Sequence, residues 1–148
     1  MFIKLKNHKA HIYEHNKSNK LASNIFIIHG AGMDHRIGLM IDLSRFYASH
    51  NIYSIDLPGH GFTSGAILHT VEEMAAYVIE IINEMDAVNN IFIGHSMGGY
   101  VALALAELYP QFIKGLVLLN STAKEDSEER KLNRDRAIKA VKQNYINF

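Results

Sequence analysis

The stretch Ile91–Gly99, which reads IFIGHSMGG, decides how the rest of the chain is interpreted. An apolar run leads into GHSMGG, which fits the pattern G-x-S-x-G between a strand and a helix. A serine on such a sharp turn has a strained backbone, and the glycines two positions away on either side avoid clashes as the turn closes. The stretch predicts a nucleophilic Ser96, exposed beyond the strand, with helical N–H groups from Met97 onward facing a developing anion. The alternative is a small-residue turn that only packs a helix on a strand.

Two further glycine-rich motifs lie upstream, each directly after an apolar segment. Residues 29–32, HGAG, follow IFII, and residues 56–61, DLPGHG, follow IYSI. An oxyanion hole needs a loop with freely placed N–H groups after the first central strand, which is where HGAG stands. Taken alone, HGAG is also compatible with an ordinary glycine turn between a strand and a helix. The order of the three motifs is what gives them meaning.

Apolar segments alternate with helical patterns along the chain, and this alternation predicts the fold class. We expect an α/β fold, a mostly parallel twisted sheet with helices on both faces and right-handed crossovers. The central apolar runs show no polar alternation, as in strands covered on both faces. Strands are expected at 2–6 and 10–14, as an antiparallel hairpin, and at 25–28, 52–55, 91–93 and 116–119. Helices are expected at 35–49 after Asp34 as N-cap, at 71–85 after a Thr70–Glu73 capping box, and at 97–109 before Pro110.

The motifs HGAG, DLPGHG and GHSMGG, in this order and each after a strand, resemble the α/β-hydrolase superfamily. The resemblance runs from about Phe2 to Thr122 and implies the first six strands of that fold, so that the sequence looks truncated after the sixth strand. Residues 1–123 would then form the N-terminal part of the hydrolase core, and residues 124–148 the start of a helical cap or lid. The strand order would differ from that of a simple Rossmann unit.

The resemblance also implies roles for individual residues. Ser96 matches the nucleophile, and the backbone N–H groups of Ala31 and Met97 match the oxyanion donors. Gly30 and His95 are expected to contact the substrate. His29 and His95 match motif histidines whose role is usually structural, so neither is expected to be the catalytic base.

The catalytic base and acid of the family have no counterpart at their usual places. All nine histidines lie at or before position 95, whereas the family's base follows the last strand. Some relatives place the acid after the sixth strand, near residues 120–121, which are Asn and Ser here. Glu125 and Asp126 are alternatives for the acid, but capping and solvating the tail helix is the favoured role for both. His35 and His60 are alternatives for the base from neighbouring loops.

Two functions follow from these observations. The first is a serine hydrolase that acts on a carboxylic ester, thioester or related acyl bond of a small molecule, with no cofactor and no metal, in which the 148 residues alone are inactive. The second is a catalytically silent binding module that kept the elbow and lost the later triad members. The family also includes acyl transfer, C–C hydrolysis and peroxidation with the same serine. Dehalogenase and epoxide hydrolase chemistry is disfavoured, since those relatives carry Asp where Ser96 stands.

The composition excludes several other classes. Formal net charge is zero, so neither a nucleic acid nor an anionic membrane is indicated as partner. There are no cysteines, and no leader or membrane-length apolar run is visible, which favours a cytoplasmic protein.

The tail and the last strand raise two further expectations. The tail reads as a helix capped by Asp126 with Glu129. Its basic side chains favour a solvated helix face, with recruitment of an anionic substrate as the alternative; they are Arg130, Lys131, Arg134, Arg136, Lys139 and Lys142. Strand 116–119 would be an exposed edge, so we expect a homodimer to form across it.

Overall fold

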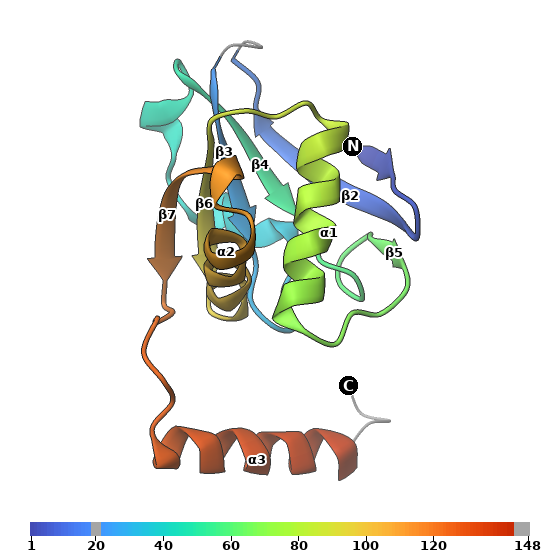
Figure 1. The fold of residues 1–148 in the computed structure, drawn as a ribbon, viewed down its shortest axis with the longest axis vertical. Helices are drawn as coiled ribbons and strands as arrows, with labels where there is room; N and C mark the ends of the chain where they lie inside the picture. Colours follow the sequence, from blue (N-terminus) through green and yellow to red (C-terminus); the bar gives the residue numbers. More distant parts are fainter. Residues whose placement is uncertain (19–21, 144–148) are drawn as a thin grey trace.

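The computed structural model describes residues 1–18 and 22–143. The strands are β1 Phe2–Lys4, β2 His8–Asn16, β3 Ser23–Ile28, β4 His50–Ile55, β5 Ser64–Gly65, β6 Asn90–His95 and β7 Ile113–Leu119. They form one twisted sheet in the order β1-β2-β4-β3-β6-β7, while the short β5 pairs with β2 (Figure 1). The order confirms the predicted α/β class and the departure from a simple Rossmann unit.

The centre of the sheet is parallel and its entry is antiparallel. β3 pairs in parallel with β4 and β6, with Ile25 opposite both Ile52 and Ile91. Its residues Phe26 and Ile27 are fully buried, as expected for a strand covered on both faces. β1 and β2 form the predicted hairpin, and β2 continues antiparallel to β4. The parallel strands therefore end at one edge of the sheet, where loops can converge.

Two α-helices cover one face of the sheet. α1 spans Val71–Glu84 and begins with the predicted capping box, in which Thr70 Oγ1 accepts from Glu73 N at 3.1 Å and Glu73 Oε2 accepts from Thr70 N at 3.1 Å. α2 spans Met97–Leu108 and packs beside α1 (Figure 1). Both helices share the larger core cluster with side chains of β3 and β6, which include Phe26 and Phe92. This packing fixes where α2 starts relative to the strand ends.

The opposite face carries 3-10 segments, and the continuous helix predicted over residues 35–49 is wrong. The structure has η1 His35–Met40 and η2 Ser44–Phe46, although Asp34 does cap the first of them as predicted. Ile41 is extended, and Asp42 Oδ1 accepts from Ser44 N at 3.1 Å. A side chain that binds a backbone N–H two residues ahead competes with a helical hydrogen bond, so the chain turns there.

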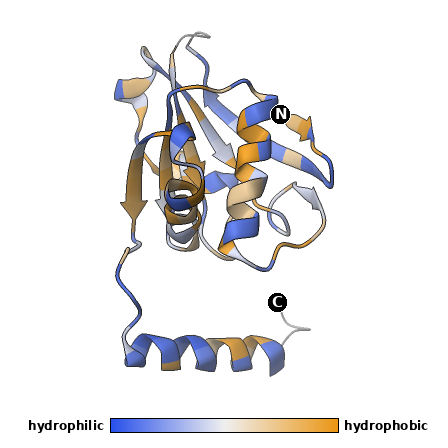
Figure 2. Cartoon of the chain, in the orientation of Figure 1, coloured by the Kyte–Doolittle hydropathy of each residue, from blue (hydrophilic) through white to orange (hydrophobic). Residues whose placement is uncertain are grey.

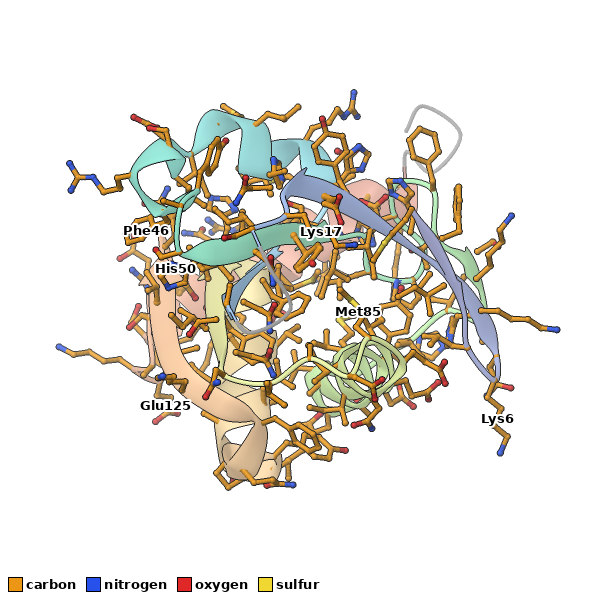
Figure 3. The ribbon with its side chains drawn as sticks, turned by 90° about the horizontal axis from the view of Figure 1, so that it is seen from above. Lys6, Lys17, Phe46, His50, Met85 and Glu125 are labelled. Carbon is orange, nitrogen blue, oxygen red and sulfur yellow. The ribbon has the colours of Figure 1, made fainter. Side chains whose placement is uncertain are left out.

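The 3-10 segments are nevertheless anchored to the sheet. Ile37 and Leu43 belong to a smaller buried cluster with Ile25, Ile52 and other side chains of the second face. The ring of Phe46 lies beside that of His50 at the start of β4, with centroids 5.5 Å apart (Figure 3). Helical segments thus cover both faces, as predicted.

The tail helix α3, Glu128–Gln143, lies past the carboxyl ends of β6 and β7 and is mostly hydrophilic (Figures 1 and 2). Its predicted cap is wrong: Ser127 Oγ, not a carboxylate oxygen of Asp126, accepts from Arg130 N at 3.3 Å. Asp126 instead binds Arg134, with Nε and Oδ2 2.6 Å apart. Ion pairing with a residue two turns along the helix thus takes the carboxylate away from the capping position. Within the described residues, no helix is long and apolar enough to cross a membrane.

Candidate active site

Ser96 lies on a sharp turn between β6 and α2, as the sequence predicts. Its backbone angles are φ 51° and ψ −113°, a conformation that residues with a Cβ rarely adopt. The surrounding chain holds this turn in place. Ser96 N donates to the carbonyl of Leu119 at 3.0 Å, and Ser96 O accepts from Gly99 N at 3.0 Å and from Ser121 Oγ at 2.9 Å. The end of β7 therefore braces the turn that exposes Ser96.

The flanking glycines are required by close backbone approach. A Cβ on Gly98 would overlap the carbonyl oxygen of Ile28, and one on Gly94 would overlap the carbonyl oxygen of Gly98. Because the obstacles are backbone atoms, no side-chain rotation relieves them. The clashes predicted for side chains at these two glycines are thus confirmed.

The HGAG loop passes directly beside the serine. A Cβ built on Gly30 would lie 3.1 Å from Ser96 Cβ and 3.1 Å from His95 Nδ1, so a larger residue would need these neighbours to shift slightly. Ala31, the next residue, is exposed. His95 Nδ1 is buried and has no hydrogen-bond partner within the described residues. The structure thus places Gly30 and His95 beside the serine turn, and Ala31 follows Gly30 in the chain.

His29 is a structural residue, as the motif match implies. Its ring is fully buried; Nδ1 donates to the Gly30 carbonyl at 2.7 Å and Nε2 accepts from Leu57 N at 3.0 Å. Burial lowers the pKa of His29, and this effect outweighs the opposite effect of the bond to Gly30. With both ring nitrogens engaged, the neutral imidazole ties the HGAG loop to the DLPGHG loop.

The DLPGHG loop is organised around the buried carboxylate of Asp56. The carboxylate accepts from His35 N at 2.6 Å, from Phe62 N at 3.0 Å, from His11 Nδ1 at 2.7 Å and from His35 Nδ1 at 3.0 Å. Burial raises the pKa of Asp56, but these hydrogen bonds outweigh it and hold the pKa below its usual value.

Sequence reasoning missed His11 and assigned His35 only as an alternative base. His35 is buried against Asp56, so it serves the loop rather than the serine. His60, the other alternative base, accepts from Gly32 N through Nε2 at 3.4 Å and supports the HGAG loop. The sequence signal for these histidines was Asp56, the first residue of DLPGHG. A carboxylate buried at the end of a strand needs hydrogen-bond donors, and histidine rings can supply them.

A cavity of about 540 Å³ opens beside the serine, between the strand ends and α3. Ala31, Met97, Gly30 and His95 do not line it. Its lining side chains are Ser96, Tyr100, Asn120, Ser121, Thr122, Arg130, Asn133, Arg134 and Ala137. The cavity therefore extends from the serine towards the tail helix rather than towards the HGAG loop.

Neither a histidine nor a carboxylate is among the described residues that line this cavity. The two candidate acids are engaged elsewhere: Asp126 pairs with Arg134, and Glu125 pairs with Lys131, the latter at 3.3 Å. Ser96 thus opens to a cavity whose described lining residues include no histidine and no carboxylate.

The mostly parallel sheet, the serine on a strand-to-helix turn and the adjacent glycine loop define the chain as an α/β protein of the hydrolase type. The alpha/beta hydrolase fold family matches residues 23–143. The chain therefore belongs to the alpha/beta hydrolase fold family.

Characterised relatives are longer than this chain. It is 27% identical over 143 residues to the (E)-2-((N-methylformamido)methylene)succinate hydrolase of Acinetobacter baylyi, covering 96% of this chain and 52% of the relative. It is 34% identical over 101 residues to the pimeloyl-[acyl-carrier protein] methyl ester esterase of Wigglesworthia glossinidia brevipalpis, covering 67% of this chain and 36% of the relative. The chain thus spans about half or less of these proteins.

A solved structure shows the same fold. An esterase from Thermogutta terrifontis superposes with a TM-score of 0.80 at 24% identity, over 97% of this chain and 54% of that chain. The relatives named above are hydrolases and esterases, which supports hydrolase activity for the family to which this chain belongs.

Proposed function

We propose that this chain carries the nucleophilic half of a serine hydrolase that acts on an ester, thioester or related acyl bond of a small molecule. The observation that carries the proposal is Ser96 itself, which is exposed, held at φ 51° on a braced turn, and open to a cavity. A strained backbone persists only where the surrounding structure holds it in place. Such residues cluster at active sites. Ser96 Oγ would attack the acyl carbon as its proton passes to a base, and the tetrahedral intermediate would collapse with loss of the alcohol or thiol to leave an acyl-enzyme that water hydrolyses.

The oxyanion of that intermediate would be held by the backbone N–H groups of Met97 and Ala31. Met97 is the first residue of α2, where amide groups have no intrahelical acceptor and the helix end is positive. Ala31 follows Gly30, whose close approach to Ser96 brings the loop to the serine. Gly30 and His95, also beside the serine, would contact the bound substrate.

Residues outside this chain would supply the base and the acid, since relatives are about twice as long and the cavity has neither group among the described residues. Residues 124–148 would begin the cap over the site, and the core would comprise residues 1–123. We further propose a cytoplasmic location, in line with the absence of cysteine.

Covalent labelling tests the proposal. A fluorophosphonate incubated with the full-length gene product is expected to add one phosphonyl group to the peptide that contains Ser96, because an activated serine attacks phosphorus as it attacks a carbonyl. Mass spectrometry of the digested protein measures the mass and the site. An unmodified Ser96 in a folded full-length protein would contradict the proposal.

One observation favours a second function, a catalytically silent binding module. The described residues around the cavity contain no histidine and no carboxylate. Reading the gene beyond Phe148 separates the two functions. An open frame that encodes two more strands, an Asp and a late His supports the hydrolase, and a stop codon supports the silent module.

We also propose that the 148-residue chain, when produced alone, forms a homodimer across β7. This strand is the last in the sheet order, and Val117 on it is 46% exposed. Unpaired backbone groups and apolar side chains at a sheet edge favour pairing with another strand.

Light scattering after gel filtration is expected to give the mass of a dimer for the wild type and the mass of a monomer for Val117→Lys. Val88→Lys, in a loop where Val88 is 60% exposed, is the control. A folded, strictly monomeric wild type would refute the dimer.

A further inference from the structure

The cavity beside Ser96 has an uneven charge. Two guanidinium groups, those of Arg130 and Arg134, are among its lining residues, whereas no carboxylate is found among the described ones. The whole chain has zero formal net charge, so the positive cavity is a local arrangement and not the result of a basic protein. The positive end of α2 at Met97 adds to the same field.

The basic residues of α3 do not contribute equally. Arg130, Asn133, Arg134 and Ala137 line the cavity. Their spacing of three, four and seven residues places them on one face of the helix, since each residue advances about 100°. Lys139 is nine residues from Arg130 and therefore on the opposite face. A helix that is only a solvated basic surface, as the sequence favours, does not account for the four residues of one face that line the cavity.

The two arginines on this face differ in their partners. Arg134 is engaged: Nε lies 2.6 Å from Asp126 Oδ2, and Nη2 donates to the Tyr100 hydroxyl at 2.8 Å. Its guanidinium also lies 5.5 Å from the centre of the Tyr100 ring. These contacts join α3 to α2 and neutralise much of the charge of Arg134. Arg134 therefore holds the helix over the site.

Arg130 is different. Among residues 1–18 and 22–143, no carboxylate lies within ion-pair distance of its guanidinium. Its neighbour on the cavity face, Asn133, offers amide N–H groups. A guanidinium binds a planar carboxylate through two parallel hydrogen bonds, and a side-chain amide can add a third.

We propose that this site selects acyl substrates that carry a second, free carboxylate, which Arg130 binds with the help of Asn133 while the scissile acyl carbon lies at Ser96. The proposal rests on the hydrolase function proposed above. A cavity of about 540 Å³ that is lined by both Ser96 and Arg130 allows one small molecule to contact both groups. A neutral acyl chain of the same length would leave Arg130 without a partner.

Matched esters and matched variants test this selection in the full-length protein. Mono-4-nitrophenyl adipate has a terminal carboxylate, and 4-nitrophenyl hexanoate is the neutral ester with the same number of carbon atoms. We expect a lower KM for the adipate ester. Arg130→Gln should raise that KM by about 10- to 100-fold with little change in kcat, as expected for the loss of a charged hydrogen bond. Arg130→Gln should change the KM of the hexanoate ester much less than that of the adipate ester, and Lys139→Gln on the opposite face should affect neither ester.

The outcomes separate this inference from the proposed function. If both esters are hydrolysed equally well and Arg130→Gln changes neither, the carboxylate selection is wrong and the hydrolase stands. If neither ester is hydrolysed and Ser96 resists the phosphonate, the proposed function fails. In that case calorimetry with the adipate dianion decides the selection. The anion site is supported if Arg130→Gln abolishes binding and Lys139→Gln leaves it intact. Equal binding by all three proteins, or no binding, overturns it.

Discussion

Replacing Ser96 with alanine is expected to lower kcat/KM of the full-length gene product by about a million-fold, the size of effect known for a serine nucleophile. In the proposed mechanism the acyl-enzyme forms on Ser96 Oγ, so its loss would leave only the binding energy and the proposed backbone oxyanion donors. The measurement is steady-state hydrolysis of 4-nitrophenyl hexanoate with purified wild type and variant. The same variant should take up no fluorophosphonate.

The control for this variant is Ser64→Ala. Ser64 is an exposed serine of β5, the short strand that pairs with β2, and it does not line the cavity. Its loss should leave kcat/KM within about twofold, because exposed substitutions away from special features cost little. A Ser96→Ala protein that retains the hydrolytic rate while its circular dichroism spectrum is unchanged would show that another residue is the nucleophile.

Replacing Asp56 with alanine is expected to lower the free energy of unfolding of the full-length protein by about 3–5 kcal/mol. The carboxylate is fully buried and accepts from His35 N, from Phe62 N and from the ring of His11. Alanine would leave these donors buried and unsatisfied, and each such loss is costly. Urea unfolding followed by circular dichroism measures the change.

The matched control is Asp42→Ala. Asp42 is exposed and accepts one backbone N–H, that of Ser44 at 3.1 Å. Its loss should cost less than about 1 kcal/mol. An Asp56→Ala protein as stable as Asp42→Ala would show that the buried hydrogen-bond cluster does not hold the loops together.

The dependence on pH provides a second readout for Asp56. Its pKa is lower in the folded state than the usual value of 3.8, so its contribution to stability is present above that value. The contribution is lost as pH falls from about 4 through the lowered folded-state pKa. Wild type should therefore lose more stability than Asp56→Ala over that acidic range. Parallel losses in both proteins would assign the acid sensitivity to other groups.

Asp56 also links stability to the proposed chemistry. The loop that follows it carries His60, which supports the HGAG loop through Gly32 N, and His29 of HGAG accepts from Leu57 N. The HGAG loop in turn passes beside Ser96 at Gly30. A loosened Asp56 cluster is therefore expected to disturb the HGAG loop as well as the fold.

Local signals in the sequence determined much of this protein. The run into GHSMGG placed Ser96 between a strand and a helix, and the Thr70–Glu73 pair marked the start of α1. These features depend on residues only a few positions apart, so they can be recognised without a structure.

The prediction of a helix was wrong where two local patterns conflicted. The apolar spacing of residues 35–49 indicated a helix, but the Asp42 side chain turned the chain and left two 3-10 segments.

Only the tertiary structure decided which distant residues meet. His11 and Asp56 are 45 residues apart in sequence, Ser121 and Ser96 25, and Arg134 and Tyr100 34. These contacts follow from the order of strands in the sheet and from the direction of α3, which no pattern of neighbouring residues encodes. The sequence by itself therefore determined the family and the serine. The bracing of that serine and the cationic cavity beside it required the sheet to bring remote segments together.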